Sequence, residues 1–420
     1  MRSLLKVTAM TGLLTLLRMA MGFVIAKVVA IYTGPTGLAM LGQVQSMVAS
    51  LNGIINAPVG NGVVRYTAEH QEQGVEACSP WWRAAWQWVL ILSAIIIPLG
   101  LLLSERLSLW LFKDISLSWV VITTAVVLPL SAVGTLFNSI INGQQQYRRY
   151  VGLGMISALA SGCLMLAMIA IYNIQGALLA AATQSALIGV VMLCLNIRQP
   201  WFNLRCWWGR CDATFRKDIR NYMLMAITSA LTVPTSLILI RNMIINQLGW
   251  DAAGQWQAVW KISEVYLGVI TMALSTYYLP RLSSLKRVDE IVDEINRTAV
   301  VIIPIVAAMA LGVYLLRDVA ITLLFTEAFR SARDLFLVQL IGDVLKISAW
   351  LYAYPMLSRG ATKQFIQTEI FFAISLLALT YVFVLEYGLI GSNIAYSVNY
   401  FLYFVFVFSV GKRFLYNECK

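Results

Sequence analysis

The segment AKVVAIYTGPTGLAMLGQVQSM (Ala26–Met47) contains a basic residue, then a Gly/Pro corner, then an apolar run with glycine and glutamine. The segment IRNMIINQLGWDAAGQWQAVWKI (Ile240–Ile262) has the same order in the second half of the chain. Lys27 precedes Gly34 by seven residues, and Arg241 precedes Gly249 by eight. Because glycine and proline mark sharp turns, the two segments predict an internal repeat whose copies both begin with two helices joined at a corner.

The composition places the chain among membrane proteins. Of the 420 residues, 60% are hydrophobic and 12% are charged, whereas a soluble domain has about 25% charged residues. The single histidine and the small number of acids leave little material for acid–base catalysis in water. The sequence therefore predicts an all-α polytopic membrane protein.

Twelve apolar segments are long enough to cross a bilayer. They cover residues 6–31, 37–64, 84–104, 117–142, 151–172, 176–197, 219–247, 254–280, 298–316, 332–357, 364–385 and 389–410. Six precede the basic connection 198–218 and six follow it, which predicts two six-helix lobes, residues 1–197 and 219–420. An even number of spans gives both lobes the same orientation, so we expect a parallel pseudo-repeat around a central cavity.

The basic residues indicate the orientation. With both termini in the cytoplasm, 21 Lys and Arg lie on the cytoplasmic side, five on the opposite side and five within spans. This asymmetry follows the positive-inside rule. It accounts for the net charge of +11 without a nucleic-acid partner. The first span, which follows the basic start MRSLLK, is interpreted as an uncleaved signal anchor.

Seven ionisable residues lie within the predicted spans: Arg18, Lys27, Arg241, Lys261, Glu264, Asp343 and Lys346. Each costs about 2.5–3.5 kcal/mol at the centre of a membrane helix, so the set would cost on the order of 20 kcal/mol against lipid. That exceeds the stability of most proteins. We therefore expect these side chains to face a hydrated interior whose net charge of +3 favours an anionic ligand.

Helical spacing supports a shared polar interior. Gln257, Lys261 and Glu264 lie on one helix face, and Gln339, Asp343 and Lys346 repeat the spacing. Neutral polar residues form similar stripes in the second and fourth spans. The predicted substrate-binding residues are Lys27, Arg241, Lys261, Lys346 and Arg18; the predicted cavity-lining residues are Gln257, Gln339, Asn138, Asn142 and Asn52. Glu264 and Asp343 are candidates for ion coupling or charge pairing.

Simpler interpretations stay open. Lys261–Glu264 and Asp343–Lys346 could be intrahelical ion pairs that only lower the cost of insertion. Lys27 and Arg241 lie near span ends, where long basic side chains reach the interface. Arg18 and Lys27 are nine residues apart, so on a straight helix they point to opposite sides. The amide stripes could serve helix–helix contact alone.

Three stretches carry a resemblance to a known family: YLPRLSSL (278–285), LLRDVAITLLFTEAFRSARDLFLVQLIGDVLKISAW (315–350) and GPTGLAMLGQ (34–43). They resemble Wzx-type flippases of lipid-linked oligosaccharides, which include O-antigen and enterobacterial common antigen lipid III flippases. These belong to the multidrug/oligosaccharidyl-lipid/polysaccharide exporter superfamily. The resemblance covers nearly the whole chain and is densest over residues 240–350.

The resemblance implies a function in surface polysaccharide and lipopolysaccharide biosynthesis. A Wzx-type flippase moves an undecaprenyl-diphosphate-linked repeat unit from the cytoplasmic to the periplasmic leaflet of the bacterial inner membrane. Alternating access through a cationic cavity is the implied mechanism, with Lys27, Arg241, Lys261, Lys346 and Asp343 at matching positions. Lys261 departs from the lipid III relatives, which points to a different sugar; an O-antigen type of repeat unit is the expected substrate. A polymerase and a chain-length regulator are the implied protein partners, and no cofactor is expected.

Two other functions remain as alternatives. A cation-coupled multidrug exporter would share the fold but favours an acidic, apolar cavity, against the computed charge of +3. An integral-membrane polysaccharide enzyme usually carries a sizeable loop with catalytic acids, whereas the longest connection here is short and basic. No G-x-x-x-x-G-K phosphate loop occurs, which argues against ATP-driven transport by this chain alone.

Overall fold

The structure is a computed structural model that describes residues 2–202, 204–209, 211–278, 281–282, 285, 287–358 and 362–418. Within these ranges the chain forms helices and no β-strand, which confirms the all-α class. The chain divides into two compact units: unit 1 comprises Met1–Tyr32 and Met40–Ile238, and unit 2 comprises Thr33–Ala39 and Leu239–Lys420. The predicted lobe boundaries around residues 198–218 stay a prediction.

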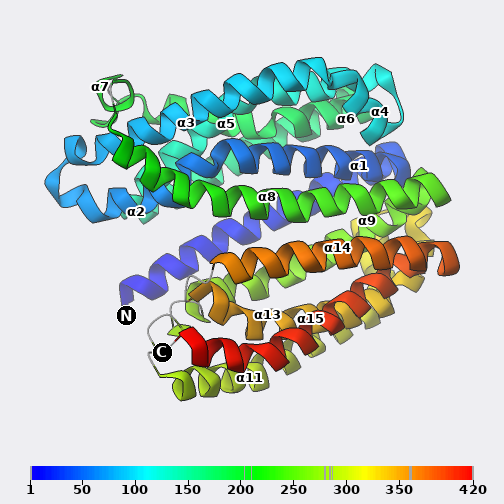
Figure 1. Ribbon diagram of the computed structural model, residues 1–420. Helices are drawn as coiled ribbons and strands as arrows, with labels where there is room; N and C mark the ends of the chain where they lie inside the picture. Colours follow the sequence, from blue (N-terminus) through cyan, green and yellow to red (C-terminus); the bar gives the residue numbers. More distant parts are fainter. Residues whose placement is uncertain are drawn as a thin grey trace. The chain divides into compact units, whose positions relative to one another are not determined.

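Unit 1 consists of antiparallel helices that follow the chain from blue to green in Figure 1. They are α1 (Arg2–Asn56), α2 (Asn61–His70), α3 (Val75–Leu102), α4 (Ser104–Phe112), α5 (Ser118–Gly143), α6 (Tyr147–Asn196), α7 (Leu204–Trp207) and the first part of α8 (Ala213–Leu248). Helices α5 and α6 approach closely because Gly134 faces Gly189, and a Cβ on Gly134 would lie 2.8 Å from the Gly189 Cα. Small residues of this kind let membrane helices pack backbone to backbone.

Unit 2 begins at the end of α8 and repeats a similar order of helices. It contains α9 (Trp250–Ala273), the π-helical turn η4 (Leu274–Tyr278), α11 (Val288–Leu315), α12 (Arg317–Leu324), the 3-10 segment η5 (Glu327–Leu335), α13 (Phe336–Ser358), α14 (Thr362–Tyr387) and α15 (Leu389–Glu418). Buried Gln255 of α9 ties down η5: its Nε2 donates to the Ala328 carbonyl at 2.7 Å, and its Oε1 accepts from the Ala332 amide at 3.0 Å.

Three backbone features recur at corresponding places in the two units. The paired features are the corners at Gly34 (φ 64°) and Gly249 (φ 87°), the bends at Leu103 (φ −98°, ψ 4°) and Leu316 (φ −95°, ψ 7°), and the corners at Asn173 (φ 51°) and Gly388 (φ 63°). Positive φ is accessible to glycine and, among other residues, most readily to asparagine. The corners at Gly34 and Asn173 interrupt α1 and α6 at the positions where the sequence predicts YTGPTG and NIQG turns.

The first of these corners packs within unit 2. Thr36 Oγ1 donates a hydrogen bond to Asp251 Oδ1 at 2.7 Å, although 215 residues separate the two. Gly254, one turn further along α9, faces the Pro35 carbonyl so closely that a side chain there would collide with the backbone. Gly254 therefore allows the backbone of α9 to lie against the backbone of the Gly34 corner.

Nine helices in the described part of the chain are long and apolar enough to cross a membrane, which supports a multi-pass membrane protein. Two of the nine contain the interruptions at Gly34 and Asn173. Helix α9 is outside the nine, and it carries Lys261 and Glu264 in its second half. Its 24 residues would still extend about 36 Å, enough for a bilayer core. The count of twelve spans stays a prediction.

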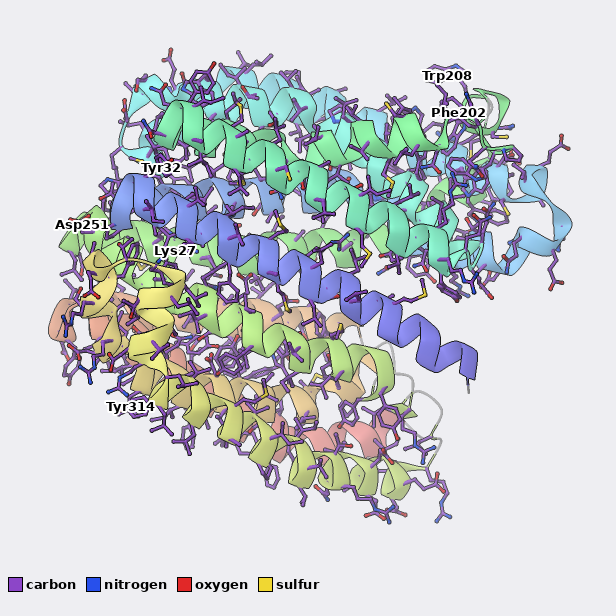
Figure 2. All side chains as sticks on the ribbon, turned by 180° about the vertical axis from the view of Figure 1, so that it is seen from behind. Lys27, Tyr32, Phe202, Trp208, Asp251 and Tyr314 are labelled. Atoms are coloured by element: carbon purple, nitrogen blue, oxygen red, sulfur yellow. The ribbon has the colours of Figure 1, made fainter. Side chains whose placement is uncertain are left out.

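The basic connection after α6 folds onto unit 1. Trp201 is buried against Phe137, with ring centroids 5.1 Å apart, and Trp207 stacks on Trp82 at 5.7 Å. Figure 2 shows Phe202 and Trp208 together at this end of the unit, and Trp208 is 68% exposed. Sequence reasoning treated this segment only as a charged linker, whereas its aromatic residues give it a packed interior.

Candidate functional site

The two charged motifs with the same spacing behave differently. On α9, Lys261 Nζ lies 3.0 Å from Glu264 Oε2, and the side chains are 23% and 58% exposed. On α13, Asp343 and Lys346 take part in none of the ion pairs found among the described residues. A direct ion pair therefore forms in the first motif, whereas Asp343 and Lys346 interact electrostatically without one.

Asp343 is fully buried and accepts hydrogen bonds from four neutral side chains, one of which is Ser263 of α9. Tyr266 of α9 donates to Oδ2 at 2.7 Å, while Tyr396 of α15 and Gln339 of α13 donate to Oδ1 at 2.9 and 3.2 Å. Asn393 of α15 in turn donates to Gln339 Oε1 at 2.8 Å. One carboxylate thus joins three helices of unit 2, and its lone pairs are used by donors other than the nearby lysine.

Lys346 is surrounded by aromatic rings. Its Nζ lies 5.0 Å from the ring centroid of Trp350, 5.4 Å from Tyr400, 5.6 Å from Trp260 and 5.8 Å from Tyr396. All four distances fall within the range of a cation–π interaction. The side chain is half-buried. We call Lys346 and these four rings the aromatic cage.

The aromatic cage stabilises a positive charge without neutralising it. Each ring contributes about 0.5–1 kcal/mol at these distances, or about 2–4 kcal/mol for four. Removing an ammonium group from water costs several kcal/mol. The rings therefore offset much of the cost of burying the ammonium group.

Arg241 is the most deeply buried of the predicted cations, at 1% exposure. Its Nε and Nη2 both donate to Gln257 Oε1, at 3.1 and 2.8 Å. Its guanidinium lies 5.7 Å from the Trp256 ring, and Trp256 stacks on Trp260 at 5.3 Å. Two stacked indoles of α9 therefore connect Arg241 with the aromatic cage.

The predicted residues of unit 1 are more dispersed. Arg18 is exposed on α1 and Lys27 is half-buried on the same helix. Asn138 and Asn142 of α5 are half-buried, and so is Asn52, whose Oδ1 is a buried atom without a hydrogen-bond partner. Convergence of these groups with those of unit 2 on one cavity stays a prediction.

Sequence reasoning missed three tyrosines of the site. Tyr266 and Tyr396 bind Asp343, and Tyr400 forms a wall of the aromatic cage. Asn393, Tyr396 and Tyr400 follow one another at helical spacing in the last apolar segment, on the helix face that meets α13. This stripe could have indicated a polar helix face, but with 18 tyrosines in the chain it did not stand out.

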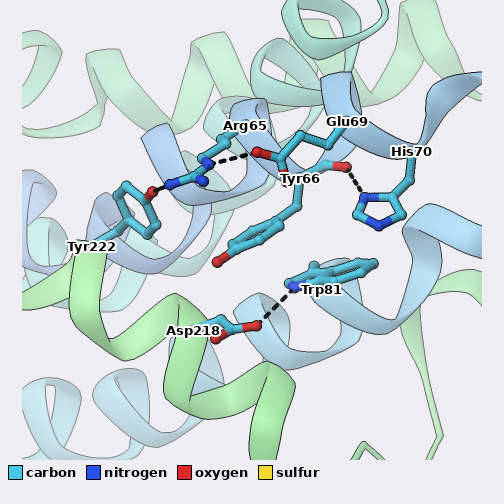
Figure 3. A network of polar contacts seen from close by, with 7 residues as sticks. All are labelled: Arg65, Tyr66, Glu69, His70, Trp81, Asp218 and Tyr222. Carbon is cyan, nitrogen blue, oxygen red and sulfur yellow. Dashed lines mark hydrogen bonds and ion pairs between the residues drawn. The ribbon is translucent and has the colours of Figure 1, made fainter.

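A second polar network joins α2, α3 and α8 within unit 1 (Figure 3). Arg65 donates to Glu69 Oε1 at 2.7 Å and also to the Tyr222 hydroxyl. Trp81 donates to Asp218 at 3.4 Å. His70, the only histidine of the chain, lies against the Trp81 ring at 4.4 Å. Arg65 and Glu69 are exposed and the other members are half-buried. The network holds the ends of helices together, so we interpret it as structural.

Comparisons with known proteins give relatives along the whole chain. The model of the family described as "Polysaccharide biosynthesis protein" matches residues 4–286. The lipid III flippase of Escherichia coli (strain K12) is 29% identical over 405 residues, which are 96% of each chain. The lipid III flippase of Shigella flexneri matches to the same extent.

Solved structures confirm the fold class. A MATE family multidrug resistance transporter of the MOP superfamily, in its inward-facing conformation, matches with a TM-score of 0.77 at 16% identity, over 96% of this chain and 98% of that one. A MOP superfamily transporter from Pyrococcus furiosus, described as having a binding pocket of reverse polarity, matches with a TM-score of 0.69 at 16% identity, over 99% and 96% of the chains.

These relatives also decide between the functional classes considered from the sequence. The sequence relatives are named flippases and the structural neighbours are transporters. The prediction of a transporter rather than an enzyme is confirmed, and the integral-membrane enzyme is set aside. With a family model matching residues 4–286 of 420, the chain belongs to the polysaccharide biosynthesis protein family.

Proposed function

We propose that the protein is a flippase that moves an undecaprenyl-diphosphate-linked oligosaccharide from the cytoplasmic to the periplasmic leaflet of the bacterial inner membrane. The family and the flippase relatives support this function. The observation that carries it is the line of Arg241, Trp256, Trp260 and Lys346, which holds two cations among apolar helices. Ionisable side chains within membrane spans are costly, and they commonly mark the pathway of a substrate or an ion.

The physical task of such a protein is to replace the water around a charged headgroup. A diphosphate and its sugars cannot cross the hydrocarbon core unsolvated, because an unpaired charge or hydroxyl is strongly disfavoured there. The two units would rock in alternating access, while the polyprenyl tail stays in lipid. Lys27, Arg241, Lys261, Lys346 and Arg18 are the proposed substrate cations; Gln257, Gln339, Asn138, Asn142 and Asn52 are the proposed polar lining.

Coupling to an ion would use the acids of unit 2. Asp343 is the better candidate because it is fully buried and bonded only to neutral groups, so a bound proton would change its contacts with Tyr266 and Tyr396. Glu264 is already paired with Lys261 at the surface of α9. An O-antigen type of repeat unit and assembly with a polymerase and a chain-length regulator are further parts of the proposal.

The test is complementation of cells that lack their own flippase. Arg241→Ala, Lys261→Ala and Lys346→Ala should each lower surface display of the polysaccharide while protein levels stay normal. Lys363→Ala, which alters an exposed lysine at the start of α14, is the matched control. Normal display by all three variants would contradict the cationic mechanism. Failure of the unaltered protein with every repeat unit tried, together with resistance to cationic drugs, would favour the multidrug exporter.

A further inference from the structure

Lys346 takes part in no direct ion pair among the described residues, although Asp343 and Glu264 are near enough to act on its charge. Asp343 stands one helical turn away, but its oxygens accept hydrogen bonds from four neutral side chains and make no direct contact with the Lys346 amine. Lys261, on the neighbouring helix, does have its carboxylate at 3.0 Å. The difference leaves Lys346 as an ammonium group in contact with ring faces, available to an anionic ligand.

The walls of the aromatic cage are fixed before any ligand arrives. The Tyr396 hydroxyl is bound to Asp343. Trp260 stacks on Trp256 and meets Tyr396 edge to face at 5.4 Å. Tyr400 also meets Tyr396 edge to face, at 4.8 Å. Side chains held in this way lose little conformational freedom when a ligand binds, so the site is pre-organised.

Part of the aromatic cage remains exposed. Lys346, Trp260, Trp350 and Tyr400 are half-buried, whereas Tyr396 is buried. A ligand would therefore meet two indoles, one phenol and one ammonium group. Binding sites of small molecules commonly combine mostly apolar and aromatic walls with a small number of polar groups that fix orientation.

The occupant of the cage determines the ligand class. An empty aromatic cage binds quaternary ammonium ligands, but here the lysine fills that position and repels a second cation. The negative ring faces instead suit the C–H groups of a sugar ring. The ammonium group suits a carboxylate or phosphate through a charge-assisted hydrogen bond.

We propose that the aromatic cage is a subsite for a pyranose ring that bears an anionic group. Trp260, Trp350 and Tyr400 contact the ring, and Lys346 binds the anion. The anion is either the carboxylate of an acidic sugar or the phosphate that links the first sugar to the lipid, and both present the same chemistry to the lysine. The inference rests on the proposed flippase function and specifies which part of the substrate this site recognises.

The experiment measures binding of four soluble probes to the full-length protein in lipid nanodiscs by ligand-observed saturation-transfer NMR. The probes are methyl glucoside, methyl glucuronide, glucose 1-phosphate and inorganic phosphate. We expect at least one anionic sugar to bind about tenfold more tightly than methyl glucoside and than phosphate, the effect of one hydrogen bond to a charged group. The tighter of the two anionic sugars identifies the source of the anion.

Substitutions separate the two parts of the site. Lys346→Met keeps the length of the side chain and should remove the preference for anionic sugars, whereas Lys346→Arg should retain it. Trp350→Leu should weaken all three sugars about equally and leave inorganic phosphate unchanged. Lys363→Met, on an exposed lysine of the same unit, controls for general charge effects. Each variant is compared only after its size-exclusion profile matches that of the unaltered protein.

Several results would overturn the inference. They are equal binding of methyl glucoside and both anionic sugars, an unchanged preference in Lys346→Met, and no detectable binding of any sugar. Complementation tells these failures apart from failure of the proposed function. If the unaltered protein restores surface polysaccharide but the probes give one of these results, the flippase stands and the subsite does not.

Discussion

Replacing Tyr266 by phenylalanine tests the charge state of the buried hub at Asp343. The Tyr266 hydroxyl donates to Asp343 Oδ2 at 2.7 Å, and both residues are buried. The substitution removes one hydroxyl and leaves the ring that fills the space. Because the remaining contacts of Tyr266 are unchanged, the change in unfolding free energy reports this hydrogen bond.

Two different values are conceivable for the contribution of this hydrogen bond to the unfolding free energy. A hydrogen bond to a charged group contributes about 1.5–3 kcal/mol, whereas an average side-chain hydrogen bond between membrane helices contributes about 0.6 kcal/mol. Asp343 is surrounded by four neutral side chains that can donate to it, namely Ser263, Tyr266, Gln339 and Tyr396. This arrangement suits an ionised carboxylate, which accepts hydrogen bonds but does not donate them. We therefore expect Tyr266→Phe to lower the unfolding free energy by about 1.5–3 kcal/mol, the charged value.

The assay is reversible unfolding of the purified protein in mixed micelles of increasing SDS content, followed by circular dichroism. Tyr381→Phe, at a tyrosine that is 53% exposed on α14, is the control and should change little. Tyr396→Phe should have a similar effect to Tyr266→Phe, and the double variant should depart from additivity because both hydroxyls share one carboxylate. A loss of about 0.6 kcal/mol or less would refute the reasoning and indicate a neutral hub.

Three further predictions rest on other contacts. Gln255→Leu removes the partner of the buried Ala332 amide and of the part-buried Ala328 carbonyl, so it should cost about 1–3 kcal/mol in the same titration. A cost below about 1 kcal/mol would contradict the role of Gln255. Gly254→Ala should destabilise the protein by about 1–3 kcal/mol because its Cβ meets backbone, whereas Gly312→Ala, with open space, should be neutral or stabilising; equal melting temperatures would argue against the close approach. Burial raises the pKa of the Cys211 thiol, with Arg216 opposing the effect, so less thiolate is present at pH 7.5 than in an ordinary cysteine. In a variant whose only cysteine is Cys211, maleimide labelling should be slower than in a variant whose only cysteine is an introduced exposed one. The labelling rate of Cys211 should also keep rising to a higher pH than the rate of the exposed cysteine. Equal pH profiles of the two rates would contradict the raised pKa.

The amino-acid sequence predicts the helical class and the corners well because these depend on local chemistry. Apolar length defines a membrane helix, and Gly34 and Asn173 supply backbone angles that other residues avoid. The recurrence of corners and bends in the two units also agrees with the repeat inferred from Ala26–Met47 and Ile240–Ile262. The predicted bounds were less accurate. The second span, predicted to run to residue 64, ends at Asn56 and is followed by the separate helix α2, at a break marked by Pro58 and Gly60.

The site was only partly predictable for a different reason. Spacing along one helix placed Asp343 and Lys346 on one face, but it could not tell which of them would be paired. That outcome depends on Tyr266 and Tyr396, which lie on other helices and form the direct hydrogen bonds to Asp343. These partners are 53 and 77 residues away from Asp343 in the sequence. The helical period of about 3.6 residues predicts only which residues of one helix share a face, so it could not identify them.

Tyr396 belongs to two sites at once, since its hydroxyl binds Asp343 and its ring forms a wall of the aromatic cage. A change at the Asp343 carboxylate that breaks its hydrogen bond with Tyr396 would also leave the Tyr396 ring less firmly held in the cage. A ligand that moves the Tyr396 ring would in turn change this hydrogen bond. With the proposed sugar at the cage and the proposed proton on Asp343, thermodynamic linkage would make the two effects equal in size. The factor by which the proton changes the affinity for sugar would be the factor by which sugar changes the affinity for the proton. One side chain would thus connect an ion gradient to cargo through a single reciprocal constant.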